Sequence, residues 1–115
     1  MSGKDPNVFL AHARDCLERI SEYAADGEQV FLTDRRTQDA ILRNLEIVGQ
    51  CIKDAGIEHL ASLDASIDWR VVGDFRNVLA HAYLSIKAEM VWAIIQNETP
   101  RLNNALKKIL ENWQP

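Results

Sequence analysis

The sequence is poor in the residues and stretches that mark several classes of protein. It has 5 glycines and 3 prolines among 115 residues, which excludes collagen-like and low-complexity chains. Its apolar stretches are much shorter than the roughly 18 residues of a membrane-spanning helix. Residues 1–6 also lack the apolar core of a signal peptide. We therefore expect a single cytoplasmic domain over residues 1–115 with no membrane partner.

Cysteine and positive charge are scarce as well. Cys16 and Cys51 are too few for a disulfide framework, so we expect reduced thiols in or beside the core. The 13 Lys and Arg residues are opposed by 17 Asp and Glu, which gives a net charge of −4. That balance argues against a protein that coats nucleic acid through bulk charge. A nucleic acid would have to bind at a small local site, and we expect no DNA partner.

The sequence is rich in apolar residues at helical spacing. Asp5 followed by Pro6 predicts a helix start, and Gly27 predicts its end. A second helix of about 22 residues is predicted from Asp34 to Gly56. Residues 57–67 favour a loop with at most a short helical turn.

The second half of the chain predicts two further helices. One begins near Trp69 with Ser66 or Asp68 as its cap, and the last begins near Lys87. Pro100 removes one backbone hydrogen bond from the last helix and predicts a kink near residue 96. The sequence therefore predicts an all-α, up-and-down bundle of four main helices with a kinked C-terminal helix.

The helix that begins at Trp69 has an unusual distribution of side chains at about 100° per residue. Apolar residues form one stripe that predicts a core face: Val71, Val72, Phe75, Val78, Leu79 and Ala82. A polar arc holds Arg70, Asp74, Asn77 and His81. Gly73 and Ala80 lie between Arg76 and Asn77, where their small size predicts a shallow cleft or close approach by a ligand or another helix. If two chains share the site, this small-residue face should lie against the second subunit.

The simplest interpretation of the polar arc is a solvated helix face. It leaves unexplained why Gly73 occupies a helix interior at a cost near 1 kcal/mol. The alternative is a site: Arg76 can hold a phosphate with its guanidinium, and His81 can transfer a proton near neutral pH. Together they supply the minimum for cleaving a phosphodiester without a metal.

One geometric difficulty concerns Arg76 and His81. Five residues of helix place the two side chains about 140° apart and about 7.5 Å apart along the axis. Three arrangements would bring them together: the helix unwinds near residues 80–83, the arginine bends round, or a second copy of the chain completes the site. A second copy also supplies a second His81, so that one histidine can act as base and the other as acid.

Other sites of common chemistry are not indicated. His12 and His59 have no Cys, His or Asp partners at metal-ligand spacing, so we expect surface residues and no metal site. No phosphate-binding loop, dinucleotide-binding turn or nucleophile signature is present, so we expect no cofactor.

Residues 76–83, which read RNVLAHAY, resemble the R-x-x-x-x-H-x-Y motif of HepT-like proteins in the HEPN superfamily. The resemblance extends to Trp69, to VWAII at residues 91–95, to PRL at residues 100–102, and to the segment from Phe31 through Gly49. It therefore covers nearly the whole chain.

The resemblance implies a HEPN-like bundle that forms a homodimer and acts as a metal-independent endoribonuclease on RNA. It implies the toxin of a type II-like toxin–antitoxin pair, with an MntA-like nucleotidyltransferase as antitoxin. Carried over by residue, Arg76 and His81 would be catalytic and Asn77 would support them. Tyr83 would receive an AMP group from the antitoxin.

Two positions depart from the family pattern, and two other functions stay open. Many relatives have Glu where this chain has Gln50, and Asp where it has Lys87. The first departure bears on partner contacts or site charge, and the second on capping of the last helix. The acidic net charge favours either a non-catalytic subunit that binds nucleotide or substrate for a nucleotidyltransferase, or a structural dimerisation module.

Overall fold

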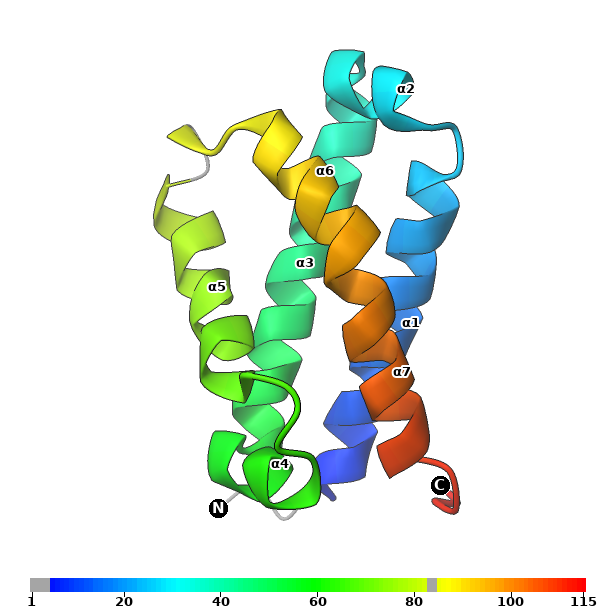
Figure 1. Ribbon diagram of the computed structural model, residues 1–115, viewed down its shortest axis with the longest axis vertical. Coiled ribbons are helices and arrows are strands. Elements are labelled where there is room, and N and C mark those ends of the chain that lie inside the picture. The colour runs from blue at the N-terminus through cyan, green and yellow to red at the C-terminus, as the bar shows by residue number, and fades with distance from the viewer. Residues whose placement is uncertain (1–4, 83–84) are drawn as a thin grey trace.

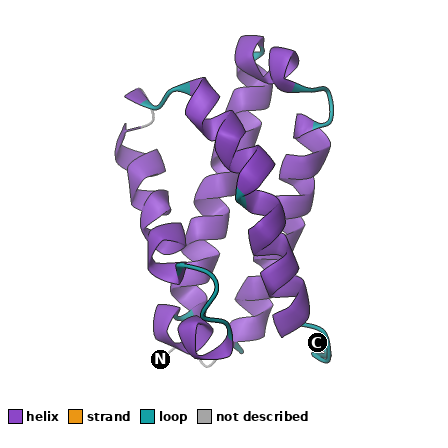
Figure 2. Ribbon diagram, in the orientation of Figure 1, coloured by secondary structure: helices purple, strands orange, loops and turns teal. Residues whose placement is uncertain are grey.

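The described residues, 5–82 and 85–115 of a computed structural model, form helices and no strand (Figure 2). The helices are α1 (Pro6–Ala24), α2 (Glu28–Thr33), α3 (Arg35–Ala55), α4 (Ile57–Leu63), α5 (Trp69–Ala82), α6 (Ala88–Asn97) and α7 (Thr99–Ile109). The prediction of an all-α bundle is confirmed. No helix in the described ranges is long and apolar enough to cross a membrane.

Four main segments run up and down the bundle, as Figure 1 shows. Helices α1 and α3 are antiparallel and share the most extensive contact in the molecule. The α6–α7 pair crosses in front of them, while α5 lies at the outer edge and packs on α3 and α4. This arrangement leaves much of the circumference of α5 uncovered by the rest of the chain.

Local sequence signals explain the main helix boundaries. The Asp5 carboxylate accepts a hydrogen bond from the Asn7 backbone N–H at 2.9 Å, which caps α1, and Pro6 occupies its first position. Gly27 and Gly56 have φ of 97° and 106°, values that side-chain-bearing residues rarely adopt. Gly27 therefore separates α1 from α2, and Gly56 separates α3 from α4.

Two short helices, α2 and α4, were not predicted, and residues 57–67 were expected to be mostly loop. Each is held by a buried apolar side chain. The Phe31 ring of α2 lies 5.5 Å from the Trp92 ring of α6, and Leu60 of α4 is fully buried. These tertiary contacts stabilise helices that are too short to be stable alone.

The C-terminal helix is kinked as predicted, but the break lies at Glu98 rather than near Gln96. Pro100 lies in the first turn of α7, where a missing backbone N–H costs little. The proline therefore begins a new helix instead of distorting a continuous one.

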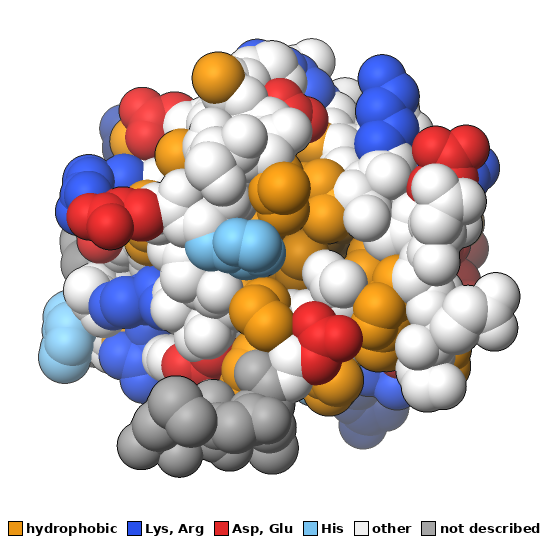
Figure 3. All heavy atoms as spheres, turned by 90° about the horizontal axis from the view of Figure 1, so that it is seen from below, with side chains coloured by type: hydrophobic (Ala, Val, Ile, Leu, Met, Phe, Trp, Pro, Cys, Tyr) orange, Lys and Arg blue, Asp and Glu red, His pale blue; other side chains and the backbone are white. Residues whose placement is uncertain are grey.

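The end of the bundle below α4 carries hydrophobic, acidic and basic side chains side by side (Figure 3). Leu63 of α4 is among the exposed large hydrophobic residues. Lys and Arg side chains on this face are interspersed with Asp and Glu, so it has no extended basic surface.

Both cysteines are free and buried, which confirms the expectation of reduced thiols in the core. Burial, together with nearby Cys16 and Asp54, raises the pKa of Cys51 to about 12. Burial also raises the pKa of Cys16. Ionised thiol is the reactive species, so the folded protein should hold both in an unreactive form.

We predict that neither thiol reacts with a disulfide reagent in the native protein at about pH 8, where roughly one Cys51 in 10⁴ is ionised. Both should react in denaturant. The measurement is the absorbance of released reagent with and without guanidinium chloride. Rapid reaction of the native protein would show that one thiol is accessible.

Candidate active site

The sequence-predicted site residues lie on α5, and the start of that helix is firmly anchored. The Asp68 carboxylate accepts a hydrogen bond from the Val71 backbone N–H at 3.2 Å, which confirms Asp68 as the cap. The Trp69 indole is buried and donates to the Asp64 carbonyl at 2.7 Å. These contacts fix the position and rotation of α5 against the bundle.

Arg76 lies where α5 approaches α3 closely. A Cβ atom added to Gly49 of α3 would stand 2.8 Å from the Arg76 Cβ and 3.2 Å from the Arg76 backbone nitrogen. Arg76 is accordingly half-buried at its base. Its Nη1 donates to the Asn77 side-chain oxygen at 3.4 Å, so the guanidinium leans towards the Asn77 side of α5.

His81 is exposed near the end of α5. The helix runs without interruption from Trp69 to Ala82, so α5 does not unwind between Arg76 and His81. The two side chains therefore start about 140° apart on one helix. Tyr83, the predicted site of modification, lies outside the described residues.

The predicted core stripe of α5 is wrong at two positions. Val71 and Val78 are 61% and 45% exposed, whereas Leu79 is buried. Helical periodicity predicts that all three of these side chains lie in the core. It identifies an apolar stripe but does not show how much of that stripe the neighbouring helices cover. The surface of α5 therefore carries apolar residues beside the polar ones.

The Gly73 part of the small-residue face is covered by the chain itself. A Cβ at Gly73 would stand 2.9 Å from the Lys53 Cγ and 3.1 Å from the Ile57 Cδ1, both in the same chain. Ala80 faces α3 beside Leu42. Gly73 therefore allows a close approach of the chain's own α3 and α4. Ala80 instead lines a pocket of about 310 Å³ between α5 and α3, as expected for a shallow cleft.

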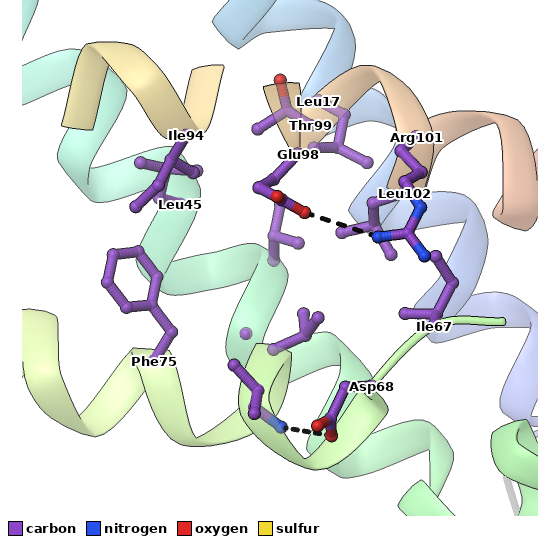
Figure 4. A pocket seen from close by; sticks show the side chains of 14 residues that line it. Leu17, Leu45, Ile67, Asp68, Phe75, Ile94, Glu98, Thr99, Arg101 and Leu102 are labelled. Carbon is purple, nitrogen blue, oxygen red and sulfur yellow. Dashed lines mark hydrogen bonds and ion pairs between the residues drawn. The ribbon is translucent and has the colours of Figure 1, made fainter. Parts of the chain in front are cut away.

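An apolar groove separates α5 from α6 and α7, with a volume of about 320 Å³. Figure 4 shows Phe75 of α5 pointing across it towards Leu45 and Ile94. The rim is charged, with Glu98 and Arg101 forming an ion pair at 3.7 Å. Val71, one of the two exposed valines of α5, lines this groove, so this side of the helix is open and largely apolar.

The two departures from the family pattern have local consequences. The Gln50 side chain donates to the Asp54 carboxylate at 3.0 Å and is thereby held along α3. Lys87 occupies the cap position of α6, and this helix has no side-chain cap hydrogen bond. An aspartate there could accept a hydrogen bond from the first turn of α6, which lysine cannot do.

No group of three or more His, Cys, Asp and Glu side chains is placed to hold a metal ion in the described ranges. His12 and His59 are exposed on α1 and α4. The chemistry that α5 can offer comes from its own side chains: a guanidinium that binds anions and an accessible imidazole.

The sequence pattern of a known family, described as Ribonuclease HepT-like, matches residues 13–109, which include all of α5. This chain belongs to the HepT-like family. The resemblance noted from the RNVLAHAY motif is thus confirmed across most of the chain.

Several curated proteins are similar along most of this chain. A "Putative RNase" of Methanocaldococcus jannaschii is 30% identical over 112 residues, covering 96% of this chain and 89% of that protein. A "Probable ribonuclease HepT" of Thermococcus cleftensis is 28% identical over 102 residues, covering 88% and 92%. Another M. jannaschii protein, "Gamma-glutamylcyclotransferase and putative RNase", is 30% identical over 109 residues. This chain spans 49% of that protein's length. No solved structure matches.

Sequence reasoning missed the part of Gly49 in the site. Gly49, like Gly73, lies in the interior of a helix, where glycine is unfavourable. This unusual position was the sequence signal that could have indicated a close contact. The periodicity of α3 does not reveal that Gly49 faces Arg76.

We predict that Gly73→Leu destabilises the folded chain itself by about 1–3 kcal/mol, because the side chain overlaps Lys53 and Ile57. Urea unfolding monitored by circular dichroism measures this change. Unchanged stability combined with a weaker dimer would instead place Gly73 at a subunit interface.

Proposed function

We propose that this chain is a single HEPN-like domain that acts as an endoribonuclease toxin, with RNA as its substrate. The family match over α5 is the observation that carries the proposal. The accessible His81 and the guanidinium of Arg76 on the same helix support it. Family relatives named as RNases agree with this function. We place the activity in the cytoplasm.

The proposed reaction needs no metal. His81 accepts the proton of the attacking RNA hydroxyl, whose oxygen bonds to the adjacent phosphorus while the bond to the leaving oxygen breaks. Arg76 binds the phosphoryl oxygens, where negative charge increases in the transition state. Asn77 supports Arg76 through the 3.4 Å hydrogen bond. A second imidazole protonates the leaving oxygen.

The second imidazole comes from a second copy of the chain in this proposal. On the α5 wheel, His81 lies within about 60° of Val78, so a contact through Val78 brings the two His81 side chains to one two-fold interface. The exposed Val71 and the adjacent apolar groove support pairing along this face. Burial of these apolar groups would stabilise the dimer.

The proposed antitoxin is an MntA-like nucleotidyltransferase that transfers AMP to Tyr83. Tyr83 follows His81 by two residues, so an AMP group there adds negative charge and bulk next to the site. A phosphate on Tyr83 would compete with RNA phosphate for Arg76. Toxin activity would thereby be silenced.

We predict that the purified protein cleaves RNA in the presence of a chelator and that His81→Ala lowers the rate by about 10²- to 10⁴-fold. His59→Ala is the matched control, because His59 is also exposed but lies on α4. Gel analysis of labelled RNA measures cleavage. Activity that survives His81→Ala, or that chelation abolishes, contradicts the mechanism. Nucleotide binding without cleavage by the wild type would favour the non-catalytic binding subunit.

We predict that Val78→Glu converts the dimer to monomer at micromolar concentration, since it buries a charge at the proposed interface. Val8→Glu serves as control, because Val8 of α1 is 45% exposed, as is Val78. Light scattering measures the mass of each variant. A wild type that is monomeric, or equal dimerisation of both variants, would contradict pairing through α5.

We predict that co-expression with the antitoxin adds AMP mass to the wild type and to Tyr23→Phe, but not to Tyr83→Phe. These are the chain's two tyrosines, and Tyr23 lies on α1. Intact-protein mass spectrometry gives the readout, and the Tyr83→Phe protein should stay toxic beside the antitoxin. Neutralisation of Tyr83→Phe would indicate inhibition by binding alone.

A further inference from the structure

Gly49 is a buried glycine in the interior of α3, where glycine is less favourable than alanine. Its backbone has ordinary helical geometry, since the described glycines with positive φ are Gly27 and Gly56. Backbone conformation therefore does not require a glycine here. The need for a glycine at position 49 comes from the atoms of α5 that pack against it.

The atoms opposite Gly49 belong to the backbone and first side-chain carbon of α5. A Cβ at Gly49 would meet the Arg76 Cβ at 2.8 Å, the Arg76 nitrogen at 3.2 Å and the Val72 carbonyl oxygen at 3.2 Å. None of these atoms can rotate away, because all three are fixed by the path of α5. A side chain at position 49 must displace α5 at Arg76.

Gly73 provides an instructive contrast on the same pair of helices. Its added Cβ would meet Lys53 Cγ at 2.9 Å and Ile57 Cδ1 at 3.1 Å. These are atoms of flexible side chains, and Lys53 is exposed and can change rotamer. The two glycines thus have equally short contacts but differ in what must move.

The contact at Gly49 falls at the base of the arginine that emerges from the interface between α3 and α5. Its guanidinium reaches the Asn77 oxygen on the accessible side of α5. Where the guanidinium stands is therefore set by two contacts, one at the Cβ and one at Nη1. If the contact at the Cβ is changed, the Arg76 Cβ moves and the whole side chain moves with it.

We infer that Gly49 is a positioning residue for Arg76, and this inference rests on the proposed ribonuclease function for its effect on catalysis. The absence of a side chain lets α5 approach α3 closely enough to fix where the guanidinium meets the phosphate. A displacement of a fraction of an ångström is sufficient to reduce turnover, because charge stabilisation depends on aligned groups.

The test compares Gly49→Ala with Gly73→Ala, two variants that add one methyl group to a helical glycine. Gly49→Ala should lower kcat for RNA cleavage by about 10- to 100-fold, with KM within about 3-fold of the wild type. Gly73→Ala should change kcat by less than about 2-fold. Both are assayed at a temperature where circular dichroism shows a folded protein.

A readout independent of activity follows the guanidinium directly. The Arg76 Nε–Hε signal in nitrogen–proton NMR spectra, assigned by its loss in Arg76→Lys, should shift in Gly49→Ala and stay in place in Gly73→Ala. If the wild type does not cleave RNA but the signal behaves as expected, positioning of Arg76 stands while the proposed function fails. An unshifted signal and unchanged kcat in Gly49→Ala overturn the inference.

A swap variant covers the case in which Gly49→Ala folds poorly. Gly49→Ala/Arg76→Gly removes the Arg76 Cβ that the new methyl group would meet at 2.8 Å, so the double variant should lose less stability than the sum of the two single substitutions. The double-mutant cycle in melting temperature then reports the contact between the two positions. Additive effects of the two substitutions would show that Gly49 and Arg76 are not coupled and would overturn the inference.

Discussion

The close approach of α5 to α3 at Gly49 is the contact on which the candidate site depends. Glycine leaves room for the Arg76 Cβ and backbone to lie directly against α3. Gly73 provides similar room one turn earlier on α5, against Lys53 and Ile57. With this face of α5 committed to its own chain, the functional side chains can emerge only at its edges and on its outer face. The order of residues in α5 therefore determines which groups are accessible.

The outer face of α5 carries both the imidazole of His81 and exposed apolar side chains. His81 lies with the exposed Val78, and Val71 borders the apolar groove between α5 and the C-terminal helices. Such exposed apolar surface is costly unless another molecule covers it. The proposed second copy would cover the valines and supply the second imidazole, so one interface would account for both the apolar residues and the need for an acid and a base.

The sequence was most informative where a single residue dictates local geometry. Asp5, Pro6, Gly27 and Gly56 predicted the limits of α1 and α3, and Pro100 predicted a break in the last helix. The short helices α2 and α4 were missed because Phe31 and Leu60 stabilise them through contacts with distant segments. Family resemblance identified α5 as the site-bearing helix, and the family match confirms the resemblance.

The rotation of α5 was the part that sequence could not provide. An apolar stripe and a small-residue stripe both predict contact, but neither names its partner. The helix keeps Val72, Phe75 and Leu79 of the predicted core face against the bundle. It also packs Gly73 against α3 and α4 and leaves Val71 and Val78 exposed. Only the packed structure distinguishes a stripe that serves the core from one that is available to a second molecule.

The most direct test of a site shared by two chains is RNA cleavage by mixtures of wild type and His81→Ala, unfolded and refolded together to exchange subunits. If each site needs a histidine from both chains, activity falls with the square of the wild-type fraction, to about a quarter at equal amounts. The account predicts this squared dependence. A linear fall, to about half at equal amounts, would show that each chain acts alone and would contradict it.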